Sequence, residues 1–276
     1  MMNEELKKQL RNRGICVIIP TYNNDTTIKT VVEKSLLYCD DVIVVTDGCT
    51  DRTTDILEAI DGITIVSYPQ NRGKGYALKM GFRKALEMGF SYAITLDGDG
   101  QHYPEDIPLF LKANREHPKS LIIGSRQLEG VDRSKGSSFA NKFSNFWFYV
   151  QTGRALPDTQ TGYRLYPLHR LCGLSLLTSR YEAELELLVF ASWHGVKLIP
   201  IPVQVYYPPR NERVSHFRPG KDFARISVLN TVLCFLAVVY GLPLRLWRTL
   251  MTFLRTAYSL LFFLFFTLVV FTPFVW

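Results

Sequence analysis

The chain has 276 residues, of which 47% are hydrophobic and 21% charged, a composition too apolar for a disordered protein. Its five cysteines form no C-x-x-C pair and no finger-like spacing, which argues against a disulfide scaffold and favours a reducing compartment. The net charge is +7, and from residue 201 onward eight bases face only two acids. This basic excess suits lipid head groups or phosphates, whereas no nucleic-acid-binding motif accompanies it.

Short apolar runs alternate with helix-period segments over residues 15–200. The runs are rich in β-branched residues and nearly continuously apolar, which is typical of strands buried on both faces: 15–19, 42–45, 63–66, 92–96 and 121–123. Helical spacing occupies the segments between them: 26–37, 53–60, 76–88 and 104–116. Repeated β-α units predict an α/β fold with a doubly wound, mostly parallel sheet. Ligands of such sheets bind at the carboxyl ends of the strands.

The second half of the chain continues with two helix candidates and one extended segment. Residues 139–152 and 181–193 have helical patterns, and the prolines in 197–207 favour a strand at a sheet edge. Two uncharged segments follow, 226–244 and 257–276. We therefore expect a catalytic domain over residues 1–225 and membrane-associated helices over residues 226–276.

The second uncharged segment, 257–276, is predicted to cross a membrane, because twenty helical residues span about 30 Å, the thickness of the hydrocarbon core. The first contains Asn230 and Pro243, so crossing and lying in the interface both stay open. Residues 1–14 lack the apolar core of a signal peptide, which places the catalytic domain on the cytoplasmic face. The chain stops within apolar sequence, and we expect it to be a fragment of a longer protein.

Polar residues follow the first two predicted strands. Pro20-Thr21-Tyr22 ends the first and Asp47 ends the second, where they can bind a nucleoside or simply form capped turns. After the third strand comes Asn71-Arg72-Gly73-Lys74-Gly75, which completes neither a P-loop nor a dinucleotide-binding motif. Lys74 can face a diphosphate or lie in a solvated loop.

The fourth strand leads directly into Asp97-Gly98-Asp99. Two carboxylates at the end of a buried strand are hard to keep ionised without a cation. A hard divalent ion that shares its oxygen ligands with substrate phosphates satisfies them. The pattern predicts a metal–diphosphate site at Asp97 and Asp99.

Further acids and bases occur later in the chain. Asp158, Arg164, Glu182 and Glu184 supply charges that can serve catalysis or structural salt bridges. The 208–220 loop presents bases and a hydroxyl that can close over an anionic donor or contact lipid head groups: Arg210, Ser215 and Arg218.

In this order, CVIIPTYNN, VIVVTDGCTD, NRGKG, ITLDGDGQH, DTQTGYRLY and ERVSHFRP resemble the family 2 glycosyltransferases of the GT-A fold. The resemblance covers residues 14–225 and is nearest to polyprenyl-phosphate sugar transferases of the dolichyl-phosphate mannose synthase type. It implies a nucleotide-sugar donor (a UDP- or GDP-sugar), a membrane lipid acceptor, and inverting transfer of one sugar.

Residue roles follow from this resemblance. Pro20, Tyr22 and Asp47 would frame the nucleoside, with Lys74 near the diphosphate, while Asp97 and Asp99 would hold Mg²⁺ or Mn²⁺. Arg164 would shape the sugar and acceptor site with Asp158. Arg210, Ser215 and Arg218 would contact phosphate.

Two departures and several alternatives accompany this interpretation. Thr46 stands where the family usually has an acid, and the Q-x-x-R-W motif of processive synthases is missing, which favours transfer of a single sugar. With a lipid hydroxyl as acceptor, a carboxylate must take its proton, and Asp158, Glu182 and Glu184 are the candidates. A sugar-nucleotide pyrophosphorylase and a non-catalytic membrane adaptor remain the rival classes.

Overall fold

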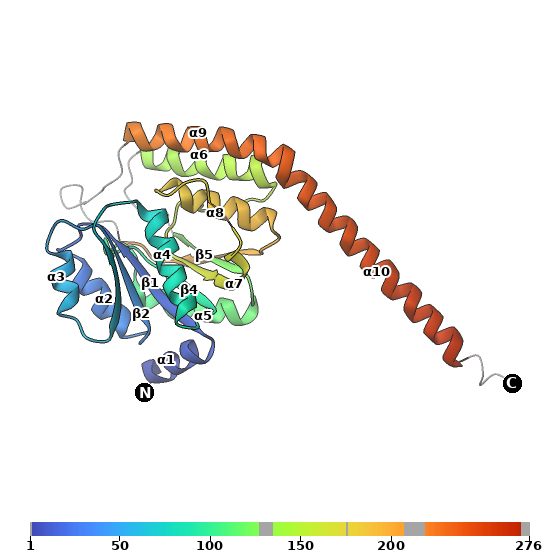
Figure 1. Cartoon of the computed structure of the whole chain (residues 1–276), viewed down its shortest axis with the longest axis horizontal. Helices are drawn as coiled ribbons and strands as arrows, with labels where there is room; N and C mark the ends of the chain where they lie inside the picture. The colour runs from blue at the N-terminus through green and yellow to red at the C-terminus, as the bar shows by residue number, and fades with distance from the viewer. Residues whose placement is uncertain (1, 127–134, 175, 207–218, 272–276) are drawn as a thin grey trace.

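The computed structural model describes residues 2–126, 135–174, 176–206 and 219–271 (Figure 1). Seven strands form one sheet in the order β3-β2-β1-β4-β6-β5-β7. Their bounds are β1 Ile15–Thr21, β2 Val42–Asp47, β3 Ile63–Tyr68, β4 Tyr92–Thr95, β5 Leu121–Arg126, β6 Arg164–Pro167 and β7 Leu198–Val203. All five strands expected from apolar runs are present, and β7 lies at an edge as its prolines indicated.

The sheet is mostly parallel. Strands β3, β2, β1 and β4 pair in parallel, and so do β5 and β7. Strand β6 is antiparallel to both of its neighbours, β4 and β5. The sequence analysis assigned no strand to residues 164–167, so β6 is an addition to the expected sheet.

Helices cover both faces of the sheet. Their bounds are α1 Met2–Asn12, α2 Ile28–Leu36, α3 Thr53–Glu58, α4 Lys74–Glu87, α5 Ile107–Glu116 (after a 3₁₀ turn, Pro104–Asp106), α6 Lys135–Thr152, α7 Leu168–Leu171, α8 Glu182–Trp193, α9 Pro219–Leu236 and α10 Leu242–Phe271. The four helices expected between the strands are all present. Helix α4 begins at Lys74, two residues before the expected start, and this brings Lys74 into its first turn.

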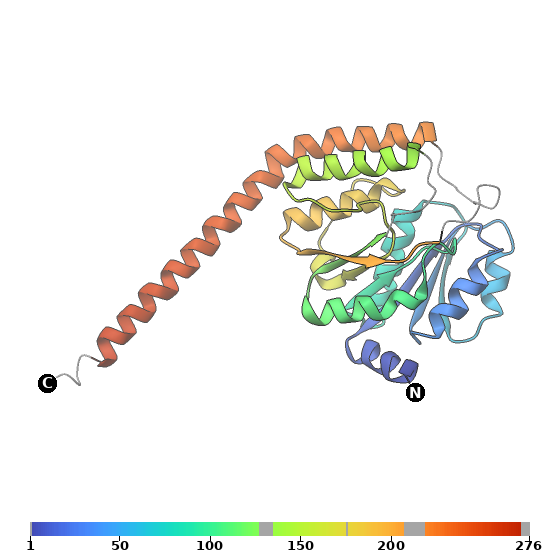
Figure 2. The ribbon, with the colours of Figure 1, turned by 180° about the vertical axis from the view of Figure 1, so that it is seen from behind.

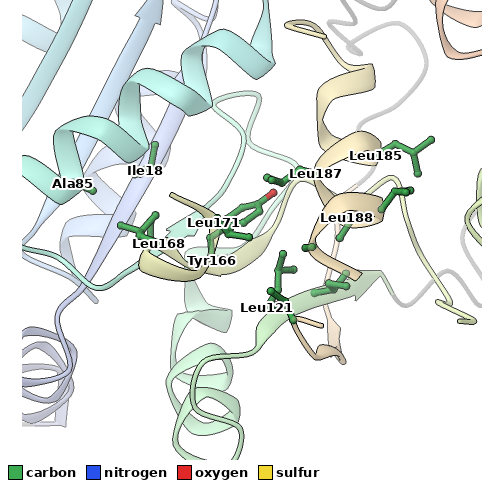
Figure 3. Close-up of a cluster of buried hydrophobic side chains, with 14 of the residues drawn as sticks. Ile18, Ala85, Leu121, Tyr166, Leu168, Leu171, Leu185, Leu187 and Leu188 are labelled. Atoms are coloured by element: carbon green, nitrogen blue, oxygen red, sulfur yellow. The ribbon is translucent and has the colours of Figure 1, made fainter. Parts of the chain in front are cut away.

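Two hydrophobic cores lie on opposite faces of the sheet. Along β1, Cys16 and Ile18 point into one core, and Ile15, Val17 and Ile19 into the other. The first core is completed by α4, α6, α8 and α9, and Figure 3 shows part of it. The second is completed by α1, α2 and α5. A sheet buried on both faces explains why its strands are continuously apolar.

The two uncharged segments near the end, as far as Phe271, belong to one long helical run rather than to separate helices. Helix α9 continues through a π turn, Ala237–Gly241, into α10, which projects away from the sheet (Figures 1 and 2). Among the described residues, Ala224–Leu261 is long and apolar enough to cross a membrane, and its apolar 18-residue window has a mean hydropathy of 2.0. A π turn is a usual cause of a helix bend.

The first part of this run packs onto the α/β domain. Leu229 and Leu233 of α9 are buried in the first core, beside α6 and α8. The Asn230 side-chain oxygen accepts a hydrogen bond of 2.9 Å from Gln151 of α6. The polar residue that made the 226–244 segment ambiguous is therefore a buried contact within the domain.

The start of α10 is also held by the domain. Arg245 donates a hydrogen bond of 2.6 Å to the carbonyl of Thr152, at the end of α6, and Arg248 donates one of 3.3 Å to the carbonyl of Trp193, at the end of α8. Arginines at helix C-termini satisfy free carbonyls and complement the helix dipole. Gly241 contacts the Trp193 ring so closely that a Cβ would lie 2.6 Å from it.

Candidate functional site

The polar residues at the carboxyl ends of the strands meet where the sheet rule expects a ligand. Asp47 is the last residue of β2 and Pro20 the second-to-last residue of β1. Asp97 and Asp99 follow β4. The nearby first turn of α4 carries Lys74, whose ammonium contacts Asp97. Five of the sequence-derived site residues are thus placed along one edge of the sheet.

Asp47 is a buried anchor for the glycine loop. One carboxylate oxygen accepts the backbone N–H of Arg72 at 2.7 Å, and the other accepts that of Gly73 at 2.8 Å. Gly48, with φ of +64°, allows residues 70 and 71 to approach, because a Cβ there would lie 2.5 Å from the Gln70 carbonyl carbon. Asp47 therefore positions the loop before Lys74, a role that the sequence analysis did not consider.

We expect Asp47→Ala to lower the stability of the fold. It leaves the N–H groups of Arg72 and Gly73 without an acceptor, and an unsatisfied buried donor such as the Gly73 N–H costs about 1–3 kcal/mol. Asp47→Asn retains one acceptor oxygen and should lose less. Thermal unfolding of the purified full chain measures this, with Asp61→Ala at an exposed position as the control. Equal melting temperatures for Asp47→Ala and Asp61→Ala would contradict the anchoring role.

The two glycines around Lys74 are required by close packing. A Cβ on Gly73 would lie 2.6 Å from Cγ of Arg180, and one on Gly75 would overlap the Cβ of Ala183. Tyr76 N–H also donates to the carbonyl of Ser179 at 2.9 Å. The start of α4 is thus pressed against the segment that leads into α8, and Lys74 is brought beside Glu184.

Lys74, Asp97 and Glu184 form a partly buried charge cluster. The Lys74 ammonium lies 2.7 Å from Oδ1 of Asp97 and 2.8 Å from Oε2 of Glu184. Burial alone would raise the pKa of Asp97, but the Lys74 charge outweighs it and holds the pKa below its ordinary value. The two carboxylates likewise outweigh the desolvation of Lys74 and raise its pKa. Lys74 and Asp97 are therefore both charged at neutral pH.

Asp99 fits the role of a metal ligand. Burial, followed by the negative charge of Asp97, raises its pKa to about 6. Oε1 of Glu184 and Oε2 of Glu182 are buried and have no hydrogen-bond partner. No group of three or more His, Cys, Asp or Glu suited to a metal occurs among the described residues. A cation here would have Asp97 and Asp99 as protein ligands and would take further oxygens from phosphates and water.

His102 contacts the backbone of the loop that contains Asp97 and Asp99. The Asp97 N–H donates to Nδ1 of His102 at 3.4 Å, and burial lowers the pKa of His102 to about 4. The histidine is therefore neutral at pH 7 and supports the backbone of the acidic loop.

Asp158 is fully engaged by neighbouring side chains. Arg126 donates to both carboxylate oxygens, at 2.6 and 3.0 Å, and Asn141 adds a bond of 2.8 Å. Burial would raise the pKa of Asp158, but the Arg126 hydrogen bonds hold it below its ordinary value. This pairing disfavours Asp158 as a general base and gives it a structural role. Arg126 was missed by the sequence analysis, since nothing in the sequence connects two residues 32 positions apart.

Arg164 is also structural in its contacts. It is fully buried, and its two terminal nitrogens donate to the carbonyls of Glu184, at 2.9 Å, and Thr159, at 3.0 Å. It therefore ties the first turn of α8 to the 159–164 segment. Glu182, two residues before Glu184 in the first turn of α8, is also buried. Tyr22 is half-buried directly after β1.

The basic loop lies outside the described residues. Arg210, Ser215 and Arg218 are in the 207–218 segment, so the structure does not place them.

The sequence matches the family model described as glycosyl transferase family 2 over residues 16–166, more than half of the chain. This chain belongs to glycosyl transferase family 2, and the family makes it a glycosyltransferase. The resemblance seen in the motifs is confirmed.

Named relatives extend the comparison. The chain is 29% identical to a UDP-N-acetylglucosamine–dolichyl-phosphate N-acetylglucosaminyltransferase of Methanococcus voltae, covering 72% of this chain and 88% of the relative. It is 27% identical to an undecaprenyl-phosphate mannosyltransferase of Micrococcus luteus, with 68% and 82% covered.

A solved structure has a similar fold. Glucosyl-3-phosphoglycerate synthase from Mycobacterium tuberculosis, in complex with Mn²⁺, UDP and phosphoglyceric acid, superposes with a TM-score of 0.64 at 19% identity, covering 85% of this chain and 82% of that one. The expected fold, an α/β sheet of GT-A type followed by a C-terminal apolar helix, is confirmed.

Proposed function

We propose that this glycosyltransferase moves one sugar, with inversion, from a nucleotide-diphosphate sugar to a polyprenyl phosphate in the membrane, using Mg²⁺ or Mn²⁺. The cluster of Lys74, Asp97, Asp99 and Glu184 at the strand ends is the observation that carries the proposal. Membership of family 2 and the polyprenyl-phosphate transferases among the relatives support it. The donor is a UDP- or GDP-sugar.

The chain's own residues would act mainly by binding and charge stabilisation. Asp97 and Asp99 would hold the cation, which when bound would neutralise charge on the diphosphate leaving group. Lys74 would add a fixed positive charge beside the same phosphates. Asp47 would keep the loop before Lys74 in place by binding its two amides.

A phosphate acceptor agrees with the state of the carboxylates. A lipid phosphate is already an anion and needs little help from a general base. A lipid hydroxyl would need one, but of the three candidates Asp158 is bound by Arg126 and Asn141, and Glu184 is bound by Lys74. This saturation favours the phosphate over the hydroxyl.

The membrane-associated part, residues 226–276, would begin on the surface of the catalytic domain. Helices α6 and α9 lie side by side (Figures 1 and 2) and expose apolar side chains: Phe139, Phe146, Tyr149 and Val150 on α6, and Val228, Val232 and Phe235 on α9. Helix α6 contains no acidic residue, and no acidic residue follows Asp222 in the chain. We propose that these apolar side chains contact lipid and that the last residues, 257–276, cross the bilayer.

This arrangement suits a catalytic domain on the cytoplasmic face. Arg245 and Arg248 are bound to the ends of α6 and α8, so they stay on the side of the catalytic domain. Arginines on the cytoplasmic side agree with the positive-inside tendency.

The affinity of the site for a divalent cation should depend on pH. Because the pKa of Asp99 is raised to about 6, this carboxyl is ionised above that pH, whereas below it a proton competes with the cation. Without nucleotide, we expect Mn²⁺ affinity to fall about tenfold for each pH unit below 6. Calorimetric titration of the full chain measures it. An affinity unchanged between pH 5 and 7 would contradict the assignment of Asp99.

The proposed reaction is tested by incubating the full chain with membranes and a panel of labelled UDP- and GDP-sugars. We expect label in the lipid extract for one donor, and mass spectrometry should identify a polyprenyl monophosphate carrying one sugar. Label on a lipid without phosphate would refute the acceptor, and several sugars on one lipid would refute single transfer. Pyrophosphate-dependent conversion of the nucleotide sugar into a nucleoside triphosphate and a sugar 1-phosphate would instead indicate a pyrophosphorylase.

A further inference from the structure

Lys74 occupies the position next to Asp97 that a bound cation would need. Its ammonium lies 2.7 Å from Oδ1 of Asp97, and the same nitrogen lies 2.8 Å from Oε2 of Glu184. The Lys74 side chain is only 15% exposed and that of Glu184 9%, so water screens this contact weakly. Asp97 is thus already paired within the protein.

The backbone of Lys74 has little freedom to move. Asp47 holds the preceding amides, and Gly73 and Gly75 pack directly against Arg180 and Ala183. The four-carbon side chain is the flexible part of the residue. Any rearrangement at this position therefore moves the ammonium and leaves the main chain in place.

Charge determines how the cluster can respond to ligands. Asp97, Asp99 and Glu184 carry three negative charges when ionised, and Lys74 supplies one positive charge among them. A divalent cation placed on Asp97 beside the Lys74 ammonium would meet a like charge at short range. A nucleoside diphosphate removes that conflict, since its oxygens can bind both the cation and the ammonium.

We propose that Lys74 couples the binding of metal and donor: it pairs with Asp97 in the empty site and transfers to the diphosphate when a divalent cation takes Asp97. The inference rests on the metal–diphosphate site proposed above. Metal and nucleoside diphosphate then bind cooperatively, each weakly alone, and by linkage each tightens the other by the same factor.

Glu184 is the residue that retains Lys74 in the site. Oε2 binds the ammonium, while Oε1 is buried without a partner. When Glu184 is neutralised, the ammonium pairs with Asp97 alone and competes more strongly with a cation. The removal of Lys74 has the opposite effect, because it leaves Asp97 and Glu184 as two adjacent carboxylates without their counterion. The two substitutions should therefore change metal affinity in opposite directions.

The test measures Mn²⁺ binding to the full chain in detergent, by the electron paramagnetic resonance signal of free Mn²⁺, with and without UDP or GDP. In the wild type, we expect the matching nucleotide to tighten Mn²⁺ binding by about 5- to 150-fold. In Lys74→Met, Mn²⁺ alone should bind more tightly than in the wild type, and the effect of the nucleotide should shrink towards onefold. In Glu184→Gln, Mn²⁺ alone should bind more weakly, and the nucleotide effect should remain. Lys79→Met, an exposed position on α4, is the matched control and should behave as the wild type.

Two results would overturn the coupling while leaving the proposed site intact. In the first, Lys74→Met binds Mn²⁺ without nucleotide as tightly as the wild type or more weakly. In the second, the nucleotide tightens Mn²⁺ binding in Lys74→Met by the same factor as in the wild type. A different pair would overturn the site itself, and the coupling with it: no Mn²⁺ binding by the wild type with either nucleotide, or binding that survives Asp99→Asn. Circular dichroism and melting temperature show whether each variant is folded.

Discussion

Asp99→Ala is expected to reduce sugar transfer by about a thousandfold or more, because it removes one of the two carboxylates assigned to the cation and leaves leaving-group charge unneutralised. Asp97→Ala should do the same and also free Lys74 from its 2.7 Å contact. The initial rate of label transfer into the lipid extract measures the loss. The fold should survive both changes, since neither side chain belongs to either hydrophobic core.

The control for this comparison is Asp55→Ala, an acid exposed on α3. It should transfer sugar at the wild-type rate. If Asp99→Ala retained wild-type turnover with the same metal requirement, the assignment of the cation to this loop would be wrong.

Gly162→Ala should displace the charged ends of Lys74 and Asp97 and so lower the rate of sugar transfer. A Cβ at this position would lie 2.6 Å from Nζ of Lys74 and 2.7 Å from Oδ2 of Asp97, too close for either. The backbone cannot easily withdraw, because the Gly162 carbonyl accepts the buried Thr95 hydroxyl at 2.7 Å. Displacing catalytic groups by about 1 Å can cost roughly a hundredfold in rate, and we expect a loss of at least that size.

Gly173→Ala is the matched control, since no atom lies within 4 Å of its added Cβ and its backbone needs no glycine-specific conformation. The rate of lipid labelling and the melting temperature are measured for both variants. A Gly162→Ala enzyme as active as Gly173→Ala would show that Lys74 and Asp97 do not need their present positions.

Much of the sheet could be predicted from the sequence because its strands are buried on both faces. Runs such as Ile15–Ile19 and Val42–Val45 have no polar alternation, and only a covered parallel sheet explains them. Strand β6 was not predicted because Arg164 and Pro167, at its two ends, are residues typical of loops. Its pairing with β4, about 70 residues earlier, comes from tertiary contacts that no local pattern records.

The positions of the acidic residues were predictable, but their partners were not. A strand that runs into Asp97 and Asp99 marks a site by position alone. The pairing of Asp158 with Arg126 and of Lys74 with Glu184 joins residues 32 and 110 positions apart, so only the folded chain brings them together. From the sequence, Asp47 was predicted to contact the nucleoside. In the structure its oxygens accept hydrogen bonds from two backbone amides.

The C-terminal run shows the same limit. Asn230 and Pro243, within the first of the two uncharged segments, left its crossing of the membrane open, but Asn230 is bound by Gln151, and Pro243 follows the π turn at the start of α10. Local propensity indicated a break, and packing against α6 and α8 kept the helix continuous.

Diffraction from crystals of the full chain soaked with Mn²⁺ and UDP or GDP, measured at the manganese absorption edge, tests the central claim most directly. The account predicts an anomalous peak bridging the Asp97 and Asp99 carboxylates and the nucleotide diphosphate, with the Lys74 ammonium on a phosphate oxygen. A manganese peak at another position, or a nucleotide lying away from the carboxyl ends of β1, β2 and β4, would contradict the account.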